Sequence, residues 1–459
     1  MSGTRRGRTP ALLSAALGVS LVLAGCGGSN VAGGGGGGGE TAAGGADCEA
    51  YTQYGDLNGT QVSLYTSIVA PEDQPHIDSY KKFEECTGAR IVYEGSKEFE
   101  AQLPVRIQSG NPPDVAYVPQ PGLLQTLVQQ TAAVKPAPQA VVTNVDQYFS
   151  ETFKSAGSVD GTLYAAPLGA NVKSFVWFSP QAFEAKGYTI PTTWDEMVAL
   201  SDRIVADGGV PWCAGINSGE ATGWPLTDWL EDTMLRENGP DVYDQWVNHE
   251  IPFNDPKVGA ALDRVGQILK NPAYVNGGLG DISTIATTTF QDGGLPILDE
   301  FCFMHRQANF YAANFPEGTD ISENGEVFAF PLPPINTTQP ETILVGAEFV
   351  AAFADRPEVQ AFQAFLSSPE WANEKAIATP EGGWISANTG LDPNNVASAV
   401  DKLSVEILQD ESKTFKFDGS DLMPAAVGSA SFWTAMTDWI TGKSTADSLT
   451  FVEQSWPQQ

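Results

Sequence analysis

The chain has 459 residues, of which 24 are basic and 56 are acidic, so its formal net charge is −32. So large a negative charge disfavours binding to nucleic acid, binding to anionic lipid through a basic patch, and binding of a polyanionic ligand. The length is sufficient for two lobes with separate hydrophobic cores.

The N-terminus has the pattern of an export signal. Three arginines between residues 5 and 8 precede the apolar run Ala11–Leu23, which is too short to span a bilayer as a helix. Small residues then lead to Cys26, and this arrangement resembles the bacterial lipoprotein signal, in which the cysteine is lipid-modified and becomes the mature N-terminus. We therefore expect a signal peptide at 1–25 and a lipid anchor at Cys26; an ordinary signal peptide with a coincidental cysteine is the alternative.

A glycine-rich segment follows the cysteine and predicts a flexible tether over residues 26–47, with Gly33–Gly39 unbroken. About 20 residues of this kind have a reach of roughly 25 Å. Without the three signal arginines, 21 basic and 56 acidic residues remain, a net charge of −35. The predicted layout is an exported domain held by a lipid anchor on the outer face of the cytoplasmic membrane.

The first part of the folded chain alternates between strand and helix. The patterns predict strands at 61–66, 89–94 and 114–118, and helices at 75–87 and 97–109. This spacing indicates a parallel sheet, in which the loops at the carboxyl ends of the strands line a crevice.

The segment Ser218–Asp232 places an indole where a loop becomes a helix. Trp224 lies between Gly223 and Pro225, and proline is favoured at the first helical position. An aromatic face with Glu220 beside it could hold a sugar ring, whose C–H faces pack on aromatics and whose hydroxyls need hydrogen-bond partners. Taken alone, the segment fits a pair of core residues, Trp224 and Trp229, better than it fits a sugar platform, so the platform depends on the rest of the chain.

The run Phe99–Val115 resembles the signature of family 1 extracellular solute-binding proteins of ABC importers. Later segments are similar to the alpha-glucoside-binding branch of that family. They are Pro211–Ile216, Ala221–Trp229, Asn248–Asp255, Met304–Ala308 and Phe417–Pro424. The resemblance covers nearly all of the mature chain and weakens over 320–340 and after Thr441.

The resemblance implies an α/β fold of the periplasmic-binding-protein type II class, with two lobes, a hinge and an interlobe cleft. The first lobe would take residues 50–172 and 338–383, and the second 173–337 and 384–459. The implied function is a monomeric receptor, without cofactor or metal, that captures maltose-, sucrose- or trehalose-like alpha-glucosides and delivers them to an ABC permease.

Four cysteines remain once Cys26 is set aside, and four cysteines allow three disulfide pairings. On the lobe division that the resemblance implies, Cys48–Cys86 and Cys213–Cys302 each stay within one lobe. We expect these two disulfides; free buried thiols are the alternative.

Three tryptophans are candidates for contact with the sugar. Trp224 and Trp384 follow glycines in predicted loops and are the expected platforms, while Trp177 faces either the cleft or the core. Trp371 and Trp433 have helical spacing among apolar neighbours, so we expect them in the core.

Six polar side chains complete the predicted site: Glu98, Asp114, Gln120, Lys173, Glu220 and Glu348. Glu348 is a charge inside an apolar run, and a buried charge needs a partner. Lys173 and Arg306 could supply that partner or could donate directly to sugar hydroxyls. Asp114 could instead be a strand-start residue bound to the backbone.

Two other functions remain open from the residues alone. A secreted glycoside hydrolase would also be acidic and aromatic, and it would need two carboxyl groups about 5 to 9 Å apart across the bond. An adhesion or scaffold lipoprotein would bind no small molecule.

Overall fold

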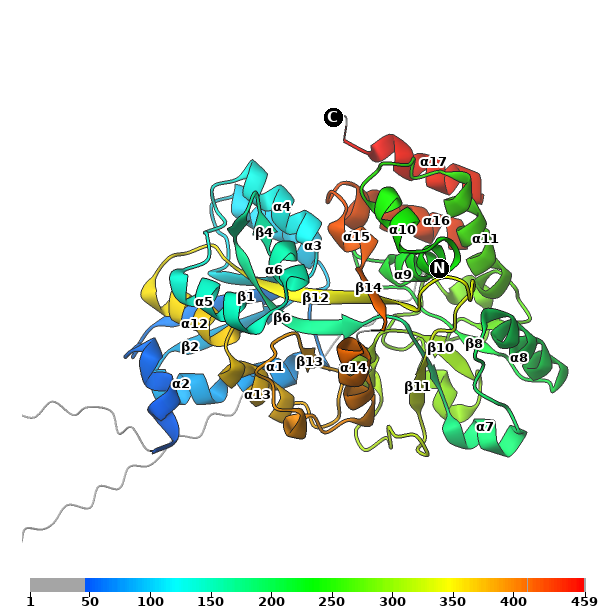
Figure 1. The fold of residues 1–459 in the computed structure, drawn as a ribbon, viewed down its shortest axis with the longest axis horizontal. Coiled ribbons are helices and arrows are strands. Elements are labelled where there is room, and N and C mark those ends of the chain that lie inside the picture. The colour runs from blue at the N-terminus through cyan, green and yellow to red at the C-terminus, as the bar shows by residue number, and fades with distance from the viewer. Residues whose placement is uncertain (1–45, 411, 458–459) are drawn as a thin grey trace, which may run out of the picture. The chain divides into compact units, whose positions relative to one another are not determined.

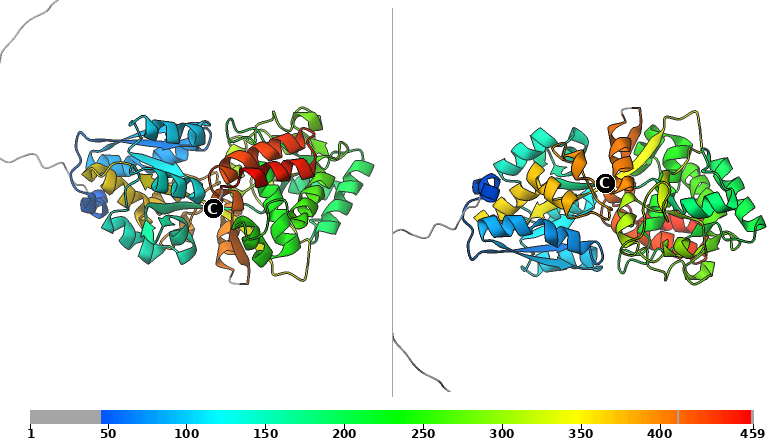
Figure 2. Two further views of the ribbon diagram at one scale, coloured as in Figure 1. Left: turned by 90° about the horizontal axis from the view of Figure 1, so that it is seen from above. Right: turned by 90° about the horizontal axis from the view of Figure 1, so that it is seen from below.

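The computed structural model describes residues 46–410 and 412–457, which fold around two β-sheets that each carry helices on their faces (Figures 1 and 2). The first sheet has the strand order β13-β6-β12-β3-β1-β2, with β14 paired to β12. Its strands are β1 (Gln61–Thr66), β2 (Arg90–Gly95), β3 (Val115–Val118), β6 (Ala165–Val172), β12 (Thr342–Ala352), β13 (Ile385–Ser386) and β14 (Thr414–Phe417).

The second sheet has the order β11-β7-β10-β8-β9. Its strands are β7 (Phe175–Phe178), β8 (Trp212–Cys213), β9 (Val275–Asn276), β10 (Met304–Arg306) and β11 (Phe328–Pro331). A small hairpin pairs β4 (Ser158–Val159) with β5 (Thr162–Leu163).

The helices divide in the same way (Figure 1). Beside the first sheet lie α1 (Asp73–Ser79), α2 (Lys81–Thr87), α3 (Phe99–Gln108), α4 (Pro121–Gln130), α5 (Gln139–Tyr148), α6 (Glu151–Ala156), α12 (Pro357–Leu366) and α13 (Pro369–Ile377). Beside the second lie α7 (Pro180–Lys186), α8 (Trp194–Ala206), α9 (Trp224–Asn238), α10 (Pro240–Val247), α11 (Pro256–Leu269), α16 (Trp433–Ile440) and α17 (Thr445–Ser455). Between the halves lie α14 (Ala399–Gln409) and α15 (Gly419–Leu422).

The five elements predicted at the start of the folded chain are all present, and β1 pairs in parallel with both β2 and β3. One detail differs, because the helix predicted at 75–87 is divided into α1 and α2 at Tyr80. The crevice expected at the carboxyl ends of these strands therefore begins with the residues that follow β1 and β3.

The chain passes between the sheets in three segments that lie side by side. Lys173 and Ser174 form the first, between β6 and β7; residues 332–341 form the second; and the third follows Phe417. The Lys173 amide donates to the carbonyl of Leu344, at 2.8 Å, and the Leu344 amide donates to Ser174 Oγ, at 2.9 Å. These hydrogen bonds join the first segment to the start of β12, which directly follows the second segment, at the place where two halves of a hinge would meet.

The last boundary between the two lobes lies later in the chain than predicted. Residues from 384 onward were expected in the second lobe, yet β13 pairs with β6 and β14 pairs with β12. The chain therefore leaves the first sheet for the last time after Phe417. Strand pairing of this kind depends on contacts far apart in the sequence, which composition around residue 384 does not show.

Both predicted disulfides are present. Cys48 pairs with Cys86 beside the first sheet, and Cys213 pairs with Cys302 beside the second, with Cα–Cα distances of 5.4 and 5.5 Å. In the described part of the chain, no helix combines the length and the apolar character needed to cross a membrane.

Candidate functional site

A cavity of about 170 Å³ lies between the two sheets and is lined by side chains from both. This volume is on the order of ten times the space that one water molecule needs, so the cavity can hold a small organic molecule. The first half contributes the residues after β1 and β3 together with parts of α1, α3 and α13. The second half contributes the start of α9, residues 290–291 and 310–313, and Trp433.

Aromatic rings form much of the wall on the side of the second half. Trp224 is half-buried at the first position of α9, and its ring centroid lies 5.1 Å from that of Phe290 and 6.0 Å from that of Phe310. Gly223 precedes it with φ of 115°, a conformation that glycine adopts easily. A Cβ at Gly223 would come within 2.2 Å of the Trp433 carbonyl oxygen, so this turn fits tightly against α16.

Trp384 and Trp433 also line the cavity, with exposures of 7% and 4%. The Nε1–H groups of both indoles have no hydrogen-bond partner among the described residues. A buried donor without a partner costs free energy, so a ligand that accepts from these groups would be stabilised.

Acceptor oxygens without a described partner face the same space. They are Glu100 Oε2, Gln120 Oε1 and Gln291 Oε1. Gln120 Nε2 donates to the other oxygen of Glu100, at 3.1 Å, so this pair is held in place with one acceptor on each residue unused. The cavity thus combines aromatic faces, donors and acceptors, the set of groups that a polyhydroxylated ligand requires.

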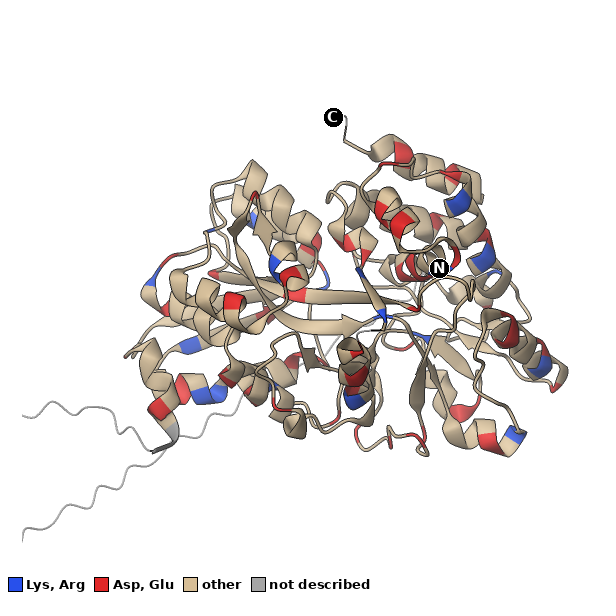
Figure 3. Ribbon diagram, viewed as in Figure 1, with Lys and Arg blue, Asp and Glu red and all other residues tan. Residues whose placement is uncertain are grey.

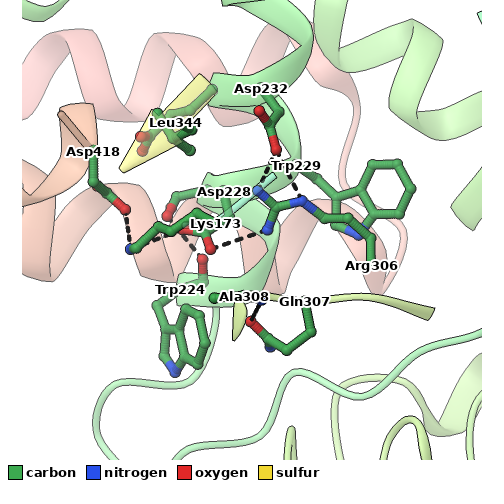
Figure 4. A network of polar contacts seen from close by, with 12 residues as sticks. Lys173, Trp224, Asp228, Trp229, Asp232, Arg306, Gln307, Ala308, Leu344 and Asp418 are labelled. Atoms are coloured by element: carbon green, nitrogen blue, oxygen red, sulfur yellow. Dashed lines mark hydrogen bonds and ion pairs between the residues drawn. The ribbon is translucent and has the colours of Figure 1, made fainter. Parts of the chain in front are cut away.

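A buried charge network lies next to Trp224 (Figure 4). Lys173 Nζ is 3.3 Å from Asp228 and 3.7 Å from Asp421, and it is in closer contact with Asp418. Burial works against the charge of Lys173, but Asp228 and Asp418 raise its pKa well above the usual value. Burial likewise opposes the charge of Asp418, yet Lys173 lowers the pKa of this carboxyl to about 2.

The network continues along α9 into the second sheet. Arg306 on β10 bridges Asp228, at 3.0 Å, and Asp232, while Arg236 lies 2.5 Å from Asp232. Ser174 Oγ donates to Asp232 at 2.7 Å. The first crossing segment is therefore fixed to α9, the helix that begins at Trp224.

A second group of ionisable side chains lies on the other side of the cavity. Burial raises the pKa of Glu72 and of Asp401 to about 7, lowers the pKa of Lys375 to about 7, and raises that of Glu348. Asn314 donates to Glu72 at 3.3 Å and Asn171 donates to Glu348 at 3.0 Å. Unlike the Lys173 network, this group has no ion pair within 4 Å among the described residues.

Five of the nine predicted site residues line the cavity: Trp224, Trp384, Gln120, Lys173 and Glu348. Lys173 and Arg306 were the expected partners of Glu348, but both are bound to aspartates. The carboxylate of Glu348 instead accepts a hydrogen bond from Asn171. The Nε1 of Trp384 and Oε2 of Glu348 both lie close to Gly169, where an added Cβ would meet them at 2.8 and 3.0 Å. A donor and an acceptor are thus side by side.

The other four predicted residues do not line the cavity. Trp177 is fully buried in the middle of the second sheet, and its Nε1–H donates to the carbonyls of Gln307 and Ala308. Asp114 lies at the amino end of β3, opposite the end that opens on the cavity, and pairs with Arg356 at 2.9 Å and with Ser63. The structure therefore contradicts the predicted ligand contact of Trp177 and of Asp114.

Glu98 and Glu220 lie near the mouth instead. Glu98 precedes α3 and Glu220 is exposed in the loop before α9. Their loops approach each other, because a Cβ at Gly219 would lie 3.3 Å from Glu98 Oε1. Neither carboxylate is directed into the cavity wall that the other residues form.

Several lining residues were not among the nine predicted site residues, namely Glu72, Glu100, Lys375 and Trp433. Trp433 was expected in the core, and it is buried, but its indole nitrogen borders the cavity. The only sequence signal for Glu72 was its position after the first strand.

Acidic residues occur over both halves of the molecule, with few basic ones among them (Figure 3).

A family comparison agrees with this architecture. The family of bacterial extracellular solute-binding proteins matches residues 77–373, more than half of the chain. The chain belongs to this family, whose members are substrate-binding proteins of ABC importers and not enzymes. The hydrolase alternative is thereby excluded.

Two relatives are similar over most of their length. The osmoprotective compounds-binding protein GgtB of Synechocystis sp. is 38% identical over 414 residues, which cover 90% of this chain and 96% of the relative. The alpha-glucosides-binding periplasmic protein AglE of Rhizobium meliloti is 36% identical over 424 residues, 90% of each chain.

Solved structures share the fold at low identity. The bacterial solute receptor AcbH has a TM-score of 0.72 at 19% identity, and its match covers 86% of this chain and 98% of that one. The maltose-bound MalE3 of T. maritima has a TM-score of 0.65 at 15% identity, with the same coverage. These matches confirm the predicted type II fold of two α/β lobes with a hinge and a cleft.

Proposed function

We propose that this protein captures alpha-glucosides of the maltose, sucrose or trehalose type and delivers them to an ABC permease. The observation that carries the proposal is the cavity between the two sheets, where the rings of Trp224, Phe290 and Phe310 meet buried donors and acceptors that have no partner among the described residues. Such a surface suits a neutral ligand with many hydroxyls. The similarity to the alpha-glucosides-binding protein AglE supports the same class.

A second candidate ligand class is favoured by the similarity to GgtB, whose name describes osmoprotective compounds. Small neutral polyols with one glucose unit would satisfy the same donors and acceptors and would fill less of the cavity. The two candidates differ in ligand size and in the number of sugar rings.

The proposed layout has lobes that meet near residues 173, 338 and 418, with Trp224, Trp384, Gln120 and Glu348 in contact with the ligand. Lys173 would support the site through Asp228 and would not be the main sugar donor. The signal at 1–25, the lipid anchor at Cys26 and residues 26–45 of the tether predicted at 26–47 lie outside the described residues, whereas residues 46 and 47 begin the 3-10 helix Ala46–Tyr54. We propose that the lipid anchor and the tether hold a monomeric receptor beside its permease.

Thermal-shift measurements on a panel test the proposal, because a ligand that binds the folded state raises the unfolding temperature. Maltose, sucrose, trehalose and a glucosylated glycerol would be compared with cellobiose as a beta-linked control. We expect a saturable shift with at least one alpha-linked compound and none with cellobiose. Equal shifts with all compounds, or none with any, would contradict the proposal.

A further inference from the structure

Two buried lysines line the cavity, and their surroundings differ. Lys173 has three carboxylates within 4 Å and is held by them. Lys375 on α13 is 2% exposed and has no carboxylate oxygen within that distance in the described part of the chain. Its Nζ donates to Thr379 Oγ1 at 2.8 Å and lies 4.9 Å from the ring centroid of Trp384.

An ammonium group has three donors, and only one of those on Lys375 has a protein acceptor among the described residues. Burial of a charge with unused donors is costly, because the lost hydration is not replaced. A cation–π contact with the face of Trp384 replaces part of the lost hydration. Lys375 lines the cavity, so a molecule bound there can accept from its remaining donors.

The charged and titratable groups around Lys375 come from three elements. Glu72 and His76 lie on or next to α1, Glu348 lies on β12 and Asp401 lies on α14. The three carboxyls would repel an anionic group placed beside the lysine. An uncharged oxygen accepts from the ammonium without this repulsion, and its own hydroxyl hydrogens can donate to the carboxyls.

We propose that Lys375 is a specificity-determining residue of the receptor, whose protonated ammonium donates to an uncharged oxygen of the bound glucoside, beside the indole N–H of Trp384. This inference rests on the proposed function. Glycosides that present a hydroxyl or ether oxygen at this point bind, and analogues that lack it or carry a carboxylate there bind weakly.

A measurable consequence follows from the state of the lysine without ligand. Burial lowers the pKa of Lys375 to about 7, so most of the amine is neutral at pH 8.5. A ligand oxygen that accepts from the ammonium favours the charged form, so binding at pH 8.5 takes up a proton. Glu72 and Asp401, whose pKa values burial raises to about 7, are already ionised at that pH and stay ionised when hydroxyls donate to them.

Isothermal titration calorimetry tests the proposal with the full chain and with trehalose, sucrose and maltose as separate probes. Titrations at pH 8.5 in phosphate and in Tris, which differ in ionisation enthalpy, give the number of protons exchanged. We expect uptake of roughly half to one proton by the wild-type protein. Lys375→Met abolishes the proton uptake. It also weakens binding at pH 6.5 at least tenfold, which is about the loss expected when one hydrogen bond from a charged donor to the ligand is removed.

Lys270→Met is the matched control. Lys270 lies 4.1 Å from the ring centroid of Trp439, is also partly buried, and does not line the cavity. This variant keeps both the affinity and the proton uptake. If Lys375→Met folds poorly, Thr379→Val provides the second variant, because it removes the protein acceptor and leaves the ammonium and the uptake in place.

The outcomes are distinguishable. A probe that binds wild type without proton uptake, and binds Lys375→Met equally well, overturns the role of Lys375 and leaves the glucoside receptor intact. If none of the three sugars binds the wild-type chain, the proposed function itself is overturned, and the assignment of Lys375 with it.

Discussion

Gly219 of the second half lies against Lys97 of the first half at the mouth of the cavity. A Cβ added to Gly219 would come within 3.0 Å of both the Cβ and the carbonyl oxygen of Lys97. Gly219 precedes α9 in the chain, and Lys97 follows β2 and lines the cavity. The two halves therefore touch across the entrance, and a methyl group at Gly219 would fit only if Lys97 moved by a few tenths of an ångström.

This contact predicts that Gly219→Ala weakens sugar binding at least fivefold. The added methyl group collides with the backbone of Lys97 and disfavours the arrangement in which the halves enclose a ligand. Affinity is measured by calorimetry, and the radius of gyration in the presence of sugar is measured by small-angle scattering. We expect a larger radius for the variant at saturating ligand.

Gly187→Ala provides a control for backbone strain. Gly187 has φ of 64°, close to the 62° of Gly219, but a Cβ there would meet only Arg203, at 3.8 Å. Both variants should lose about 1 kcal/mol of stability without ligand, because alanine is strained at positive φ. Equal affinities for the two variants would show that the contact at the mouth plays no part in closure.

Trp224→Ala should weaken sugar binding strongly while it leaves the fold intact. Trp224 is half-buried and borders the cavity, so its loss removes an apolar face worth about 2 to 3 kcal/mol of binding, roughly 30- to 150-fold in Kd. Trp177→Ala is the contrast, since this fully buried indole should cost about 3 to 5 kcal/mol of stability. Urea unfolding and titration with the best sugar of the panel distinguish the two. A similar loss of stability in both variants would mean that Trp224 is a core residue.

The local part of the site could be predicted from the sequence. Gly223, Trp224 and Pro225 determine a helix start through their own backbone preferences, and Gln120 follows a short buried strand whose direction is clear from its neighbours. These positions depend on a few adjacent residues. Local patterns therefore placed them next to the cleft.

The remaining part depends on which distant strands pair. Lys375 and Trp433 lie in helices with ordinary amphipathic spacing, and they reach the cavity only because β13 joins β6 and because α16 packs beside Gly223. Asp114 was expected at the site because it lies next to a strand, but it is at the amino end of β3. In a parallel sheet the crevice lies at the carboxyl ends of the strands, so the position of Asp114 before β3 already favoured the alternative of a strand-start residue.

Lys173→Met should be among the most destabilising single changes in this chain. The substitution leaves Asp228, Asp418 and Asp421 close together without their shared cation, and loss of one partner of a buried ion pair costs about 3 to 5 kcal/mol. Lys81→Met removes an exposed pair with Asp78 and should cost less than about 1 kcal/mol. Urea unfolding at neutral pH measures both. A loss below 1 kcal/mol for Lys173→Met would contradict the structural role of the network.

The pKa of Glu72 predicts how stability without ligand depends on pH. Burial raises this pKa to about 7 in the folded protein, while the carboxyl in the unfolded chain keeps the ordinary value near 4.3. The folded state therefore binds the proton more tightly, so the stabilising contribution is complete below about pH 4 and is lost as the pH rises through 7.

Glu72→Gln mimics the protonated carboxyl at every pH. We expect it to change stability by less than about 1 kcal/mol at pH 4.5 and to raise it at pH 8 by about 1 to 3.5 kcal/mol, the upper end being the full linkage value. Unfolding in urea at the two pH values measures this, with the exposed Glu184→Gln as a control that should change little at either pH. Equal effects of Glu72→Gln at pH 4.5 and 8 would show that Glu72 is ionised throughout this range and that its burial is compensated within the cavity.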